Sequence, residues 1–333
     1  MIRRVLGSRE TLLLAVIVVL AIVFGLLAPQ FFSLAHLFGI ARSSVVIGIM
    51  ALGLLVVLIT GGIDVSVSAT AVASMYITAV LLTDLDYQGP FVLAALLACV
   101  VGAVFGLVNA TLVSLLKLPS LIVTLGTLTL FRGGLLAFVG TERLRVLPAR
   151  MTEFSSTQLF TVTSAGRQAS LHLAVLILVV LAVALALALR RTNWGRNLYA
   201  VGGNEEAATR LGVAVTRVRF SAFVLAGTLA GLAGLMSGSL NRAADPFTIV
   251  GTEMDVLAAV VLGGASVTGG RGTVFGTMLG VLLITMVGAS LVLVGIPSAW
   301  RQAFVGLFLI LGVGVPALRQ RRVERARGVV VSA

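Results

Sequence analysis

Residues that build disulfides, metal sites and nucleotide sites are scarce in this sequence. Among its 333 residues are one cysteine and two histidines, so it can form neither an internal disulfide nor a Cys/His zinc cluster. No GxxxxGK[ST] segment occurs, so the chain has no ATP-binding phosphate loop of its own. Paired carboxylates that would indicate a membrane transferase are also missing. We therefore expect a protein that is not an enzyme and carries no cofactor.

Charged residues are rare as well, and this shortage indicates the class of protein. Only 11% of the residues are charged and 59% are hydrophobic, with a mean hydropathy of +1.14, whereas soluble domains are about 25% charged. The net charge of +12 would indicate nucleic-acid binding in a soluble protein. Here the basic residues lie between apolar runs, so we interpret them as topology signals beside membrane lipid and expect no nucleic-acid partner.

What the sequence does have is a series of apolar runs, and crossing a membrane takes roughly 20 such residues. We predict an all-α, polytopic membrane protein with about ten transmembrane helices in one permease-like domain, residues 1–333. The eighth run is short, and Thr252 with Asp255 fits a capping box that opens it. The predicted spans are 11–28, 43–60, 65–83, 91–116, 120–139, 170–190, 219–240, 253–264, 274–294 and 302–318.

The distribution of basic residues predicts the orientation of these spans. With the N-terminus in the cytoplasm, 16 of the 24 basic residues fall on the cytoplasmic side, as the positive-inside rule favours. Both termini are then cytoplasmic, with short tails at 1–10 and 319–333. The longest inner loop is 191–218.

A short repeat indicates two related halves. Residues 102–106 read GAVFG and residues 272–276 read GTVFG. These copies fall in the fourth and ninth predicted spans, and an offset of five spans reverses the chain direction. The halves would then be inverted repeats, which are common in transporters. The alternative is a chance match between segments rich in glycine and valine.

A glycine-rich break interrupts the apolar pattern between residues 251 and 280. Unpaired backbone groups cost several kcal/mol in a bilayer, so this break belongs at a membrane face or along a path walled by protein. Gly263, Gly264, Gly269 and Gly270 are predicted to hold non-helical backbone, by φ > 0 or by a close helix approach. We assign them to a translocation path or gate; the alternative is that they only ease packing.

The inner loop contains a short helix with its own capping residues. An asparagine is the predicted N-cap, acids fill the first turn, an arginine comes late, and a glycine ends the helix. One interpretation is a surface helix that only closes the loop, and the other is a docking helix that receives force from a soluble partner. The predicted coupling residues are Asn204, Glu205, Glu206, Ala207, Ala208, Arg210, Leu211 and Gly212.

Four segments in order resemble the permease subunits of ATP-binding-cassette sugar importers, the ribose/xylose/rhamnose and autoinducer-2 group. They read TGGIDVSV at 60–67, PSLIVTLGT at 119–127 and NEEAATRLGV at 204–213, followed by the glycine-rich segment at 251–280. The resemblance covers nearly the whole chain, with Ser68 in place of the family's usual glycine. It implies a vitamin-B12-permease-like fold with inverted repeats, in the bacterial cytoplasmic (inner) membrane.

The resemblance also implies a function and partners. The chain would be the permease of an importer for a monosaccharide or sugar-like solute, of the ribose, rhamnose or autoinducer-2 type; which one is left open. Its partners would be a second permease subunit in a homo- or heterodimer, ATP-binding subunits, and a periplasmic or lipid-anchored sugar-binding protein. The outer segment 140–169 is the expected contact for that binding protein, with a solvated loop as the alternative.

Four polar residues within or near the spans are further candidates for the path or gate, namely Asp64, Asn109, Thr124 and Thr127. For Asp64 the alternative is an N-cap of the third span, and for the others it is hydrogen bonding between helices. The alternative function is a secondary, ion-coupled carrier. Such a carrier normally needs ionisable groups at mid-membrane, and we predict that acids are missing from the middle of the spans.

Overall fold

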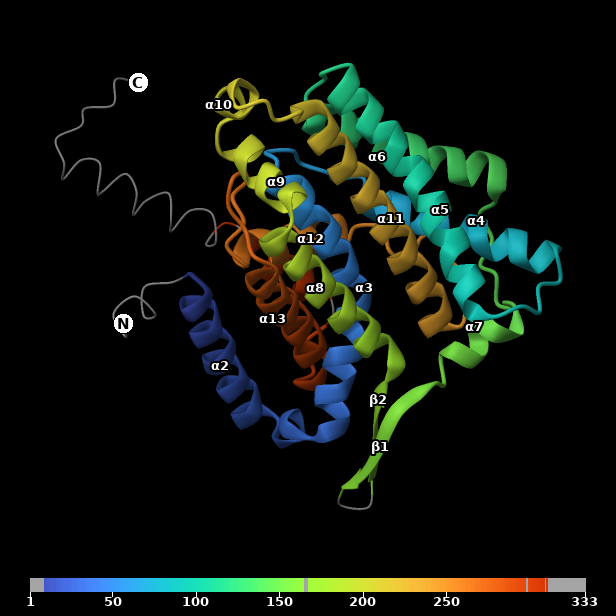
Figure 1. The fold of residues 1–333 in the computed structure, drawn as a ribbon. Coiled ribbons are helices and arrows are strands. Elements are labelled where there is room, and N and C mark those ends of the chain that lie inside the picture. Colours follow the sequence, from blue (N-terminus) through green and yellow to red (C-terminus); the bar gives the residue numbers. More distant parts are fainter. Residues whose placement is uncertain (1–8, 165–166, 298, 309, 311–333) are drawn as a thin grey trace.

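The computed structural model describes residues 9–164, 167–297, 299–308 and 310, which form a bundle of helices with one small β-hairpin (Figure 1). The antiparallel strands are β1 (Gln158–Ser164) and β2 (Arg167–His172). The helices are α2 (Arg9–Leu27), α3 (Leu34–Ile59), α4 (Val67–Asp84), α5 (Phe91–Ala110), α6 (Ser120–Gly134), α7 (Ala149–Phe154), α8 (Leu173–Arg191), α9 (Asn193–Gly203), α10 (Glu205–Arg210), α11 (Val215–Asn241), α12 (Glu253–Leu262) and α13 (Val274–Leu293). Three short turns of helix are η1 (Pro29–Phe32), η2 (Thr111–Leu115) and η3 (Leu135–Val139).

Eight helices of the described residues are long and apolar enough to cross a membrane, which confirms the predicted polytopic, helical class. They are α2, α3, α4, α5 with η2, α6 with η3, α8, α11 and α13. The short eighth run forms α12, whose 10 residues are about half of what a bilayer needs. The predicted tenth span at 302–318 lies largely outside the described residues, as do most of the tail at 1–10 and all of 319–333.

Helices α3 and α11 form the centre of the bundle, and α11 packs against α3, α4 and α5. The approach of α5 to α11 depends on glycine. A Cβ on Gly102 would lie 2.3 Å from the carbonyl oxygen of Gly227, and one on Gly106 would lie 2.7 Å from that of Phe223. Small residues at such positions let membrane helices pack backbone to backbone. These helices therefore pack as one tight unit.

Two non-helical segments enter the bundle from opposite ends, residues 60–66 between α3 and α4 and residues 242–252 between α11 and α12. Helix α4 begins beyond the midpoint of α11, since a Cβ on Gly234 would lie 2.0 Å from the carbonyl oxygen of Ala71. The Ser68 hydroxyl of α4 donates to the Glu253 carboxylate of α12 at 2.7 Å. The first turns of both helices therefore meet inside the bundle.

The helix contacts follow the order that an inverted repeat requires. An offset of five spans relates α3 to α11, α4 to α12 and α5 to α13. The contact of α5 with α11 then corresponds to that of α13 with α3, and the contact of α11 with α4 corresponds to that of α3 with α12. All four contacts are present. This pattern supports the repeat, which stays a prediction.

Two features differ from the sequence prediction. Helix α3 begins at Leu34 rather than near residue 43, because the Ser33 hydroxyl caps it and because Arg42 finds a partner within the bundle. The Arg42 guanidinium donates to the carbonyl oxygen of Leu240 at 2.8 Å. The β1–β2 hairpin begins in the predicted outer segment 140–169, ends at His172 within the predicted sixth span, and is an addition to the predicted all-α fold.

Candidate functional site

The residues predicted as functional gather in two places. The first lies at the end of the bundle opposite the β-hairpin, where α9 and α10 are found (Figure 1). We call residues 193–213, which comprise α9, α10 and the turn after them, the coupling segment. The second is a buried polar cluster around segment 60–66.

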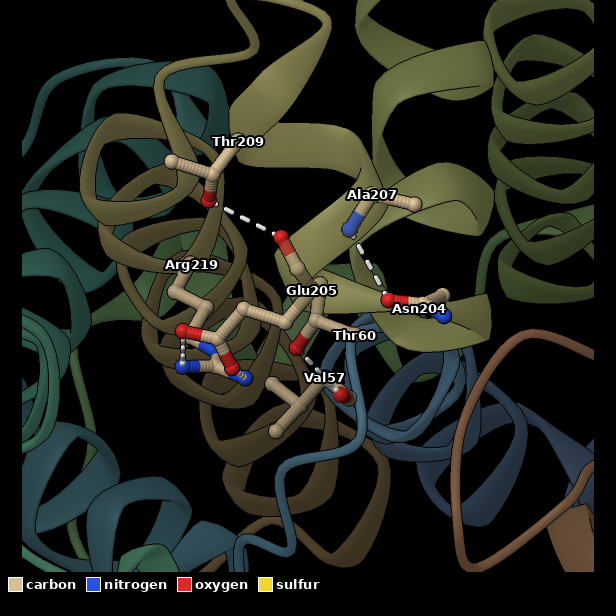
Figure 2. Close-up of polar contacts among 7 residues, drawn as sticks. All are labelled: Val57, Thr60, Asn204, Glu205, Ala207, Thr209 and Arg219. Carbon is tan, nitrogen blue, oxygen red and sulfur yellow. Dashed lines mark hydrogen bonds and ion pairs between the residues drawn. The ribbon is translucent and has the colours of Figure 1, made fainter.

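Helix α10 is capped as predicted. The Asn204 side-chain oxygen accepts a hydrogen bond from the backbone N–H of Ala207 at 2.9 Å, and the Thr209 hydroxyl donates to the carbonyl oxygen of Glu205 at 2.8 Å (Figure 2). Gly212 ends the segment with a φ of +80°, which glycine adopts without strain. The sequence of this loop therefore specifies its helix locally.

One face of α10 contacts the bundle. Ala208 is buried with 2% of its surface exposed. The Glu205 carboxylate accepts two hydrogen bonds from the Arg219 guanidinium of α11, at 2.6 and 3.2 Å (Figure 2). The Arg219 side chain is 28% exposed and that of Glu205 is 52% exposed. This ion pair joins α10 to a membrane-spanning helix.

The other face of α10 is free. Glu206 pairs with Arg210 one turn later at 2.6 Å, and both side chains are more than three-quarters exposed, at 77% and 78%. Leu211 follows and is 83% exposed. A single exposed leucine does not by itself mark an interface. This face of α10 therefore presents one exposed ion pair and one exposed apolar side chain.

A groove of about 720 Å³ lies beside α10. Its walls come from the coupling segment and the start of α11 on one side, and from residues 61–62 and 113–121 on the other. Glu205, Arg219 and Lys117 line it with charge. The groove separates α10 from the connection between α5 and α6.

The coupling segment also meets two of the predicted gate glycines. A Cβ on Gly202 would lie 1.8 Å from the carbonyl oxygen of Ile59, and one on Gly269 would lie 2.8 Å from that of Gly202 and from the Cα of Gly61. The N–H of Gly270 donates to the carbonyl oxygen of Ile59 at 2.9 Å. We call this contact of Ile59, Gly61, Gly202, Gly269 and Gly270 the glycine junction. It is built from backbone alone.

Three of the four gate glycines have the predicted non-helical backbone, while Gly263 has a helical φ of −63°. Gly264, Gly269 and Gly270 have φ values of +94°, +90° and +71°. Gly263 instead makes a close approach, since its Cβ would lie 2.4 Å from the carbonyl oxygen of Gly276. The role of these four residues in a path or gate stays a prediction.

Two aromatic side chains of α9 hold the coupling segment in place. The Tyr199 hydroxyl donates to the carbonyl oxygen of Gly272 at 2.8 Å. Burial raises the pKa of Tyr199, so the hydroxyl keeps the proton that it donates. The Trp194 indole N–H donates to the Ser221 hydroxyl of α11 at 2.8 Å. Helix α9 is thus tied both to the glycine-rich loop and to α11.

The buried polar cluster brings together three predicted path residues. The Asp64 carboxylate accepts from the N–H and the hydroxyl of Ser66, at 2.9 and 2.7 Å. The Asn109 amide donates to the same hydroxyl at 2.7 Å, and the Thr124 hydroxyl donates to the backbone of segment 60–66 at 3.1 Å. Thr127 lies one turn further along α6 and bonds to the backbone of Thr124. In the single chain these buried side chains fix the segment and do not line the groove.

One acid near the start of the eighth predicted span is buried in the bundle, while the absence of acids from the middle of the spans stays a prediction. Asp255 is 7% exposed and forms an ion pair with Arg301, while Glu253 accepts from Ser68. The reason is that α12 is a half-length helix whose first turn lies inside the bundle. The predicted capping box is wrong, because Asp255 faces Arg301 and the Thr252 hydroxyl donates to a backbone carbonyl instead.

Sequence reasoning missed three residues of these sites, and the signals for them differ in strength. In the sequence, Arg219 is only one of the basic residues that predict the orientation of the spans. Its 14-residue separation from Glu205 matches no local helix pattern, so the ion pair could not be predicted. Ser66 lies inside a motif that the resemblance singles out. Arg301 had the clearest signal, since an arginine at the start of an apolar span needs a partner.

Comparison with known proteins gives the family. The family described as "Branched-chain amino acid transport system / permease component" matches residues 36–313. The autoinducer 2 import system permease protein LsrC of Salmonella typhi is 36% identical over 93% of this chain and 86% of its own length. The protein of the same name from Escherichia coli O9:H4 is 33% identical over 93% and 87%. No solved structure matches the chain. The chain therefore belongs to the family of permease components of branched-chain amino acid transport systems.

Proposed function

We propose that this chain is the membrane-spanning permease of an ATP-binding-cassette importer, and that α10 docks into a cleft of a separate ATP-hydrolysing subunit. The free face of α10, with Leu211 83% exposed between a capped helix and a glycine turn, is the observation that carries the proposal. The sequence has no phosphate-binding loop motif, so in this proposal ATP is hydrolysed by a partner subunit.

A charge reversal on the free face tests this docking. Glu206→Arg is expected to reduce co-purification of the ATP-binding subunits or abolish uptake, because it inverts a charge on the free face. Adding Glu205→Arg also breaks the ion pair with Arg219. Glu153→Arg is the matched control for co-purification, since Glu153 forms an exposed pair with Arg150 near the β-hairpin, at the other end of the bundle from α10. Full uptake with both α10 acids reversed would refute the docking.

We propose autoinducer 2 or a monosaccharide-like solute as the cargo. The support is that relatives 33–36% identical over most of the chain carry autoinducer 2 names, although the family description names branched-chain amino acids. Proteoliposomes that hold the permease with its ATP-binding subunits and binding protein should take up autoinducer 2, ribose or rhamnose. Uptake of leucine alone would contradict the proposal.

The α10 end is proposed to face the cytoplasm, with both termini on that side and the segment 140–169 outside, where the binding protein would dock. A second permease subunit would complete the assembly. In a Cys99→Ala background, cysteines introduced at Ser156 and Thr209 should react with an impermeant maleimide from opposite sides. Labelling of both cysteines from the same side would contradict the proposed topology.

Secondary transport is a second candidate, because the structure buries Asp64 and Asp255 as proton-coupled carriers bury acids. The contacts of these acids favour a structural role, since Asp64 accepts two hydrogen bonds from Ser66 and Asp255 is paired with Arg301. Uptake that survives loss of ATP but stops with a proton ionophore would support the carrier instead.

A further inference from the structure

We infer that the Glu205–Arg219 ion pair is the positioning contact through which movement of the coupling segment reaches α11 and, along it, the hairpin end of the bundle. This inference rests on the proposed docking of α10 to an ATP-hydrolysing subunit. It gives the neighbouring residues Glu205 and Glu206 different roles. Glu206 faces the partner, and Glu205 faces the permease itself.

Glu205 and Glu206 differ in the location of their ion-pair partners. Glu206 pairs with Arg210 on the same helix, so that pair moves with α10 and cannot transmit force away from it. Glu205 pairs with Arg219 through two hydrogen bonds across a gap of 14 residues. Together with the buried Ala208, this pair holds α10 against α11.

Helix α11 is packed so that it would move as one rigid element. Glycines bring its backbone against α5 at Gly227 and Gly231 and against α4 at Gly234, so it packs rigidly along one side. Its far end meets the hairpin region, where Arg242 hydrogen-bonds to Ser155 after α7. Arg219, near the start of α11, and the last residues of the helix are therefore parts of one stiff element.

The groove supplies room for the movement. It is lined by both members of the ion pair and by Gly61 of the glycine junction, with Lys117 and Ser120 on the opposite wall. This open space beside Glu205 and Thr209 is where α10 would move. The junction then acts as the fixed point, and the ion pair as the contact that follows α10.

The test follows a reporter at the far end of α11 in the full complex. Asn241, which is exposed, is replaced by cysteine in a Cys99→Ala background, and its maleimide labelling is compared without nucleotide and after trapping with ATP and vanadate. We expect a several-fold change in labelling rate when the pair is intact. Arg219→Gln should abolish most of that change while the ATP-binding subunits stay bound, and the exchange Glu205→Arg with Arg219→Glu should restore it. Arg217→Gln, an exposed position in the same turn of α11, is the matched control.

Three outcomes overturn the inference. These are an unchanged response in Arg219→Gln, no recovery in the charge exchange, and no response of the reporter with the pair intact. Failure of the proposed function is separate, because it shows as ATP-binding subunits that do not co-purify with the unmodified chain or that ignore Glu206→Arg.

Discussion

The coupling segment is held on two sides by contacts of opposite kinds. On one side, the glycine junction brings backbone against backbone, with the N–H of Gly270 bonded to the carbonyl of Ile59 at 2.9 Å. On the other, Glu205 and Arg219 meet through long side chains that are 52% and 28% exposed. The first contact has no rotatable side chain and cannot adjust. The second can break and form again at little cost, because exposed ion pairs contribute only about 0–1 kcal/mol.

This difference shows that stability and coupling need not come from the same contacts. The rigid glycine junction fixes the point about which the coupling segment can rotate. The weak Glu205–Arg219 pair determines whether α11 moves with α10. Substitutions at the glycine junction should therefore change folding and transport together, whereas substitutions at the ion pair should change transport alone.

The largest expected effect comes from adding a methyl group at Gly202. Its Cβ would lie 1.8 Å from the carbonyl oxygen of Ile59, so Gly202→Ala should destabilise the permease by about 1–3 kcal/mol, as overpacking does. Gly203→Ala is the matched control, because nothing lies within 4 Å of the Cβ added there. Thermal unfolding in detergent measures both. Equal melting temperatures would show that the junction is looser than the structure indicates.

The next effect concerns the gate glycines. Gly264→Val with Gly270→Val forces side chains into left-handed backbone, and at Gly270 also against the Cα of Gly203 at 2.8 Å. We expect the protein to insert but to move less solute per ATP hydrolysed in proteoliposomes. Gly295→Val has the same strain, with a φ of +80°, but meets open space. A normal transport ratio in the double variant would show that the break is passive.

A smaller effect is expected at the ion pair. A double-mutant cycle with Glu205→Gln and Arg219→Gln should give a coupling energy of about 0.2–1 kcal/mol in thermal unfolding, because the pair is partly exposed. The energy should fall with added salt, since screening weakens such pairs. A value of several kcal/mol would mean that the pair is structural, and the contrast with the junction would disappear.

The smallest effect is expected on the free face. Glu206→Gln removes an i,i+4 pair with Arg210, which contributes only about 0.2–0.5 kcal/mol to a helix. Melting temperature should hardly change, while affinity for the ATP-binding subunits should fall measurably. If the melting temperature drops as far as in Gly202→Ala, α10 is a packing element and not a docking helix.

Local chemistry made part of this structure predictable from sequence. The cap at Asn204, the stop at Gly212 and the left-handed glycines at 269 and 270 follow from which residues tolerate which backbone. The spans follow from apolar length. Contacts between distant residues were beyond that reasoning, and Arg219, Arg301 and the meeting of Ser68 with Glu253 depend on helix packing that no local pattern encodes.

The close packing of α11 bears on how this protein is made. Helix α11 belongs to the second half of the chain, yet its glycines fill the space between α4 and α5 of the first half. During synthesis, the faces of Gly102 and Gly106 have no helix to cover them until more than 100 further residues have been inserted. The surface of α5 at Gly102 and Gly106 therefore stays uncovered in the bilayer until α11 is inserted. A chain cut in the β-hairpin would yield two fragments that reach a native state only together.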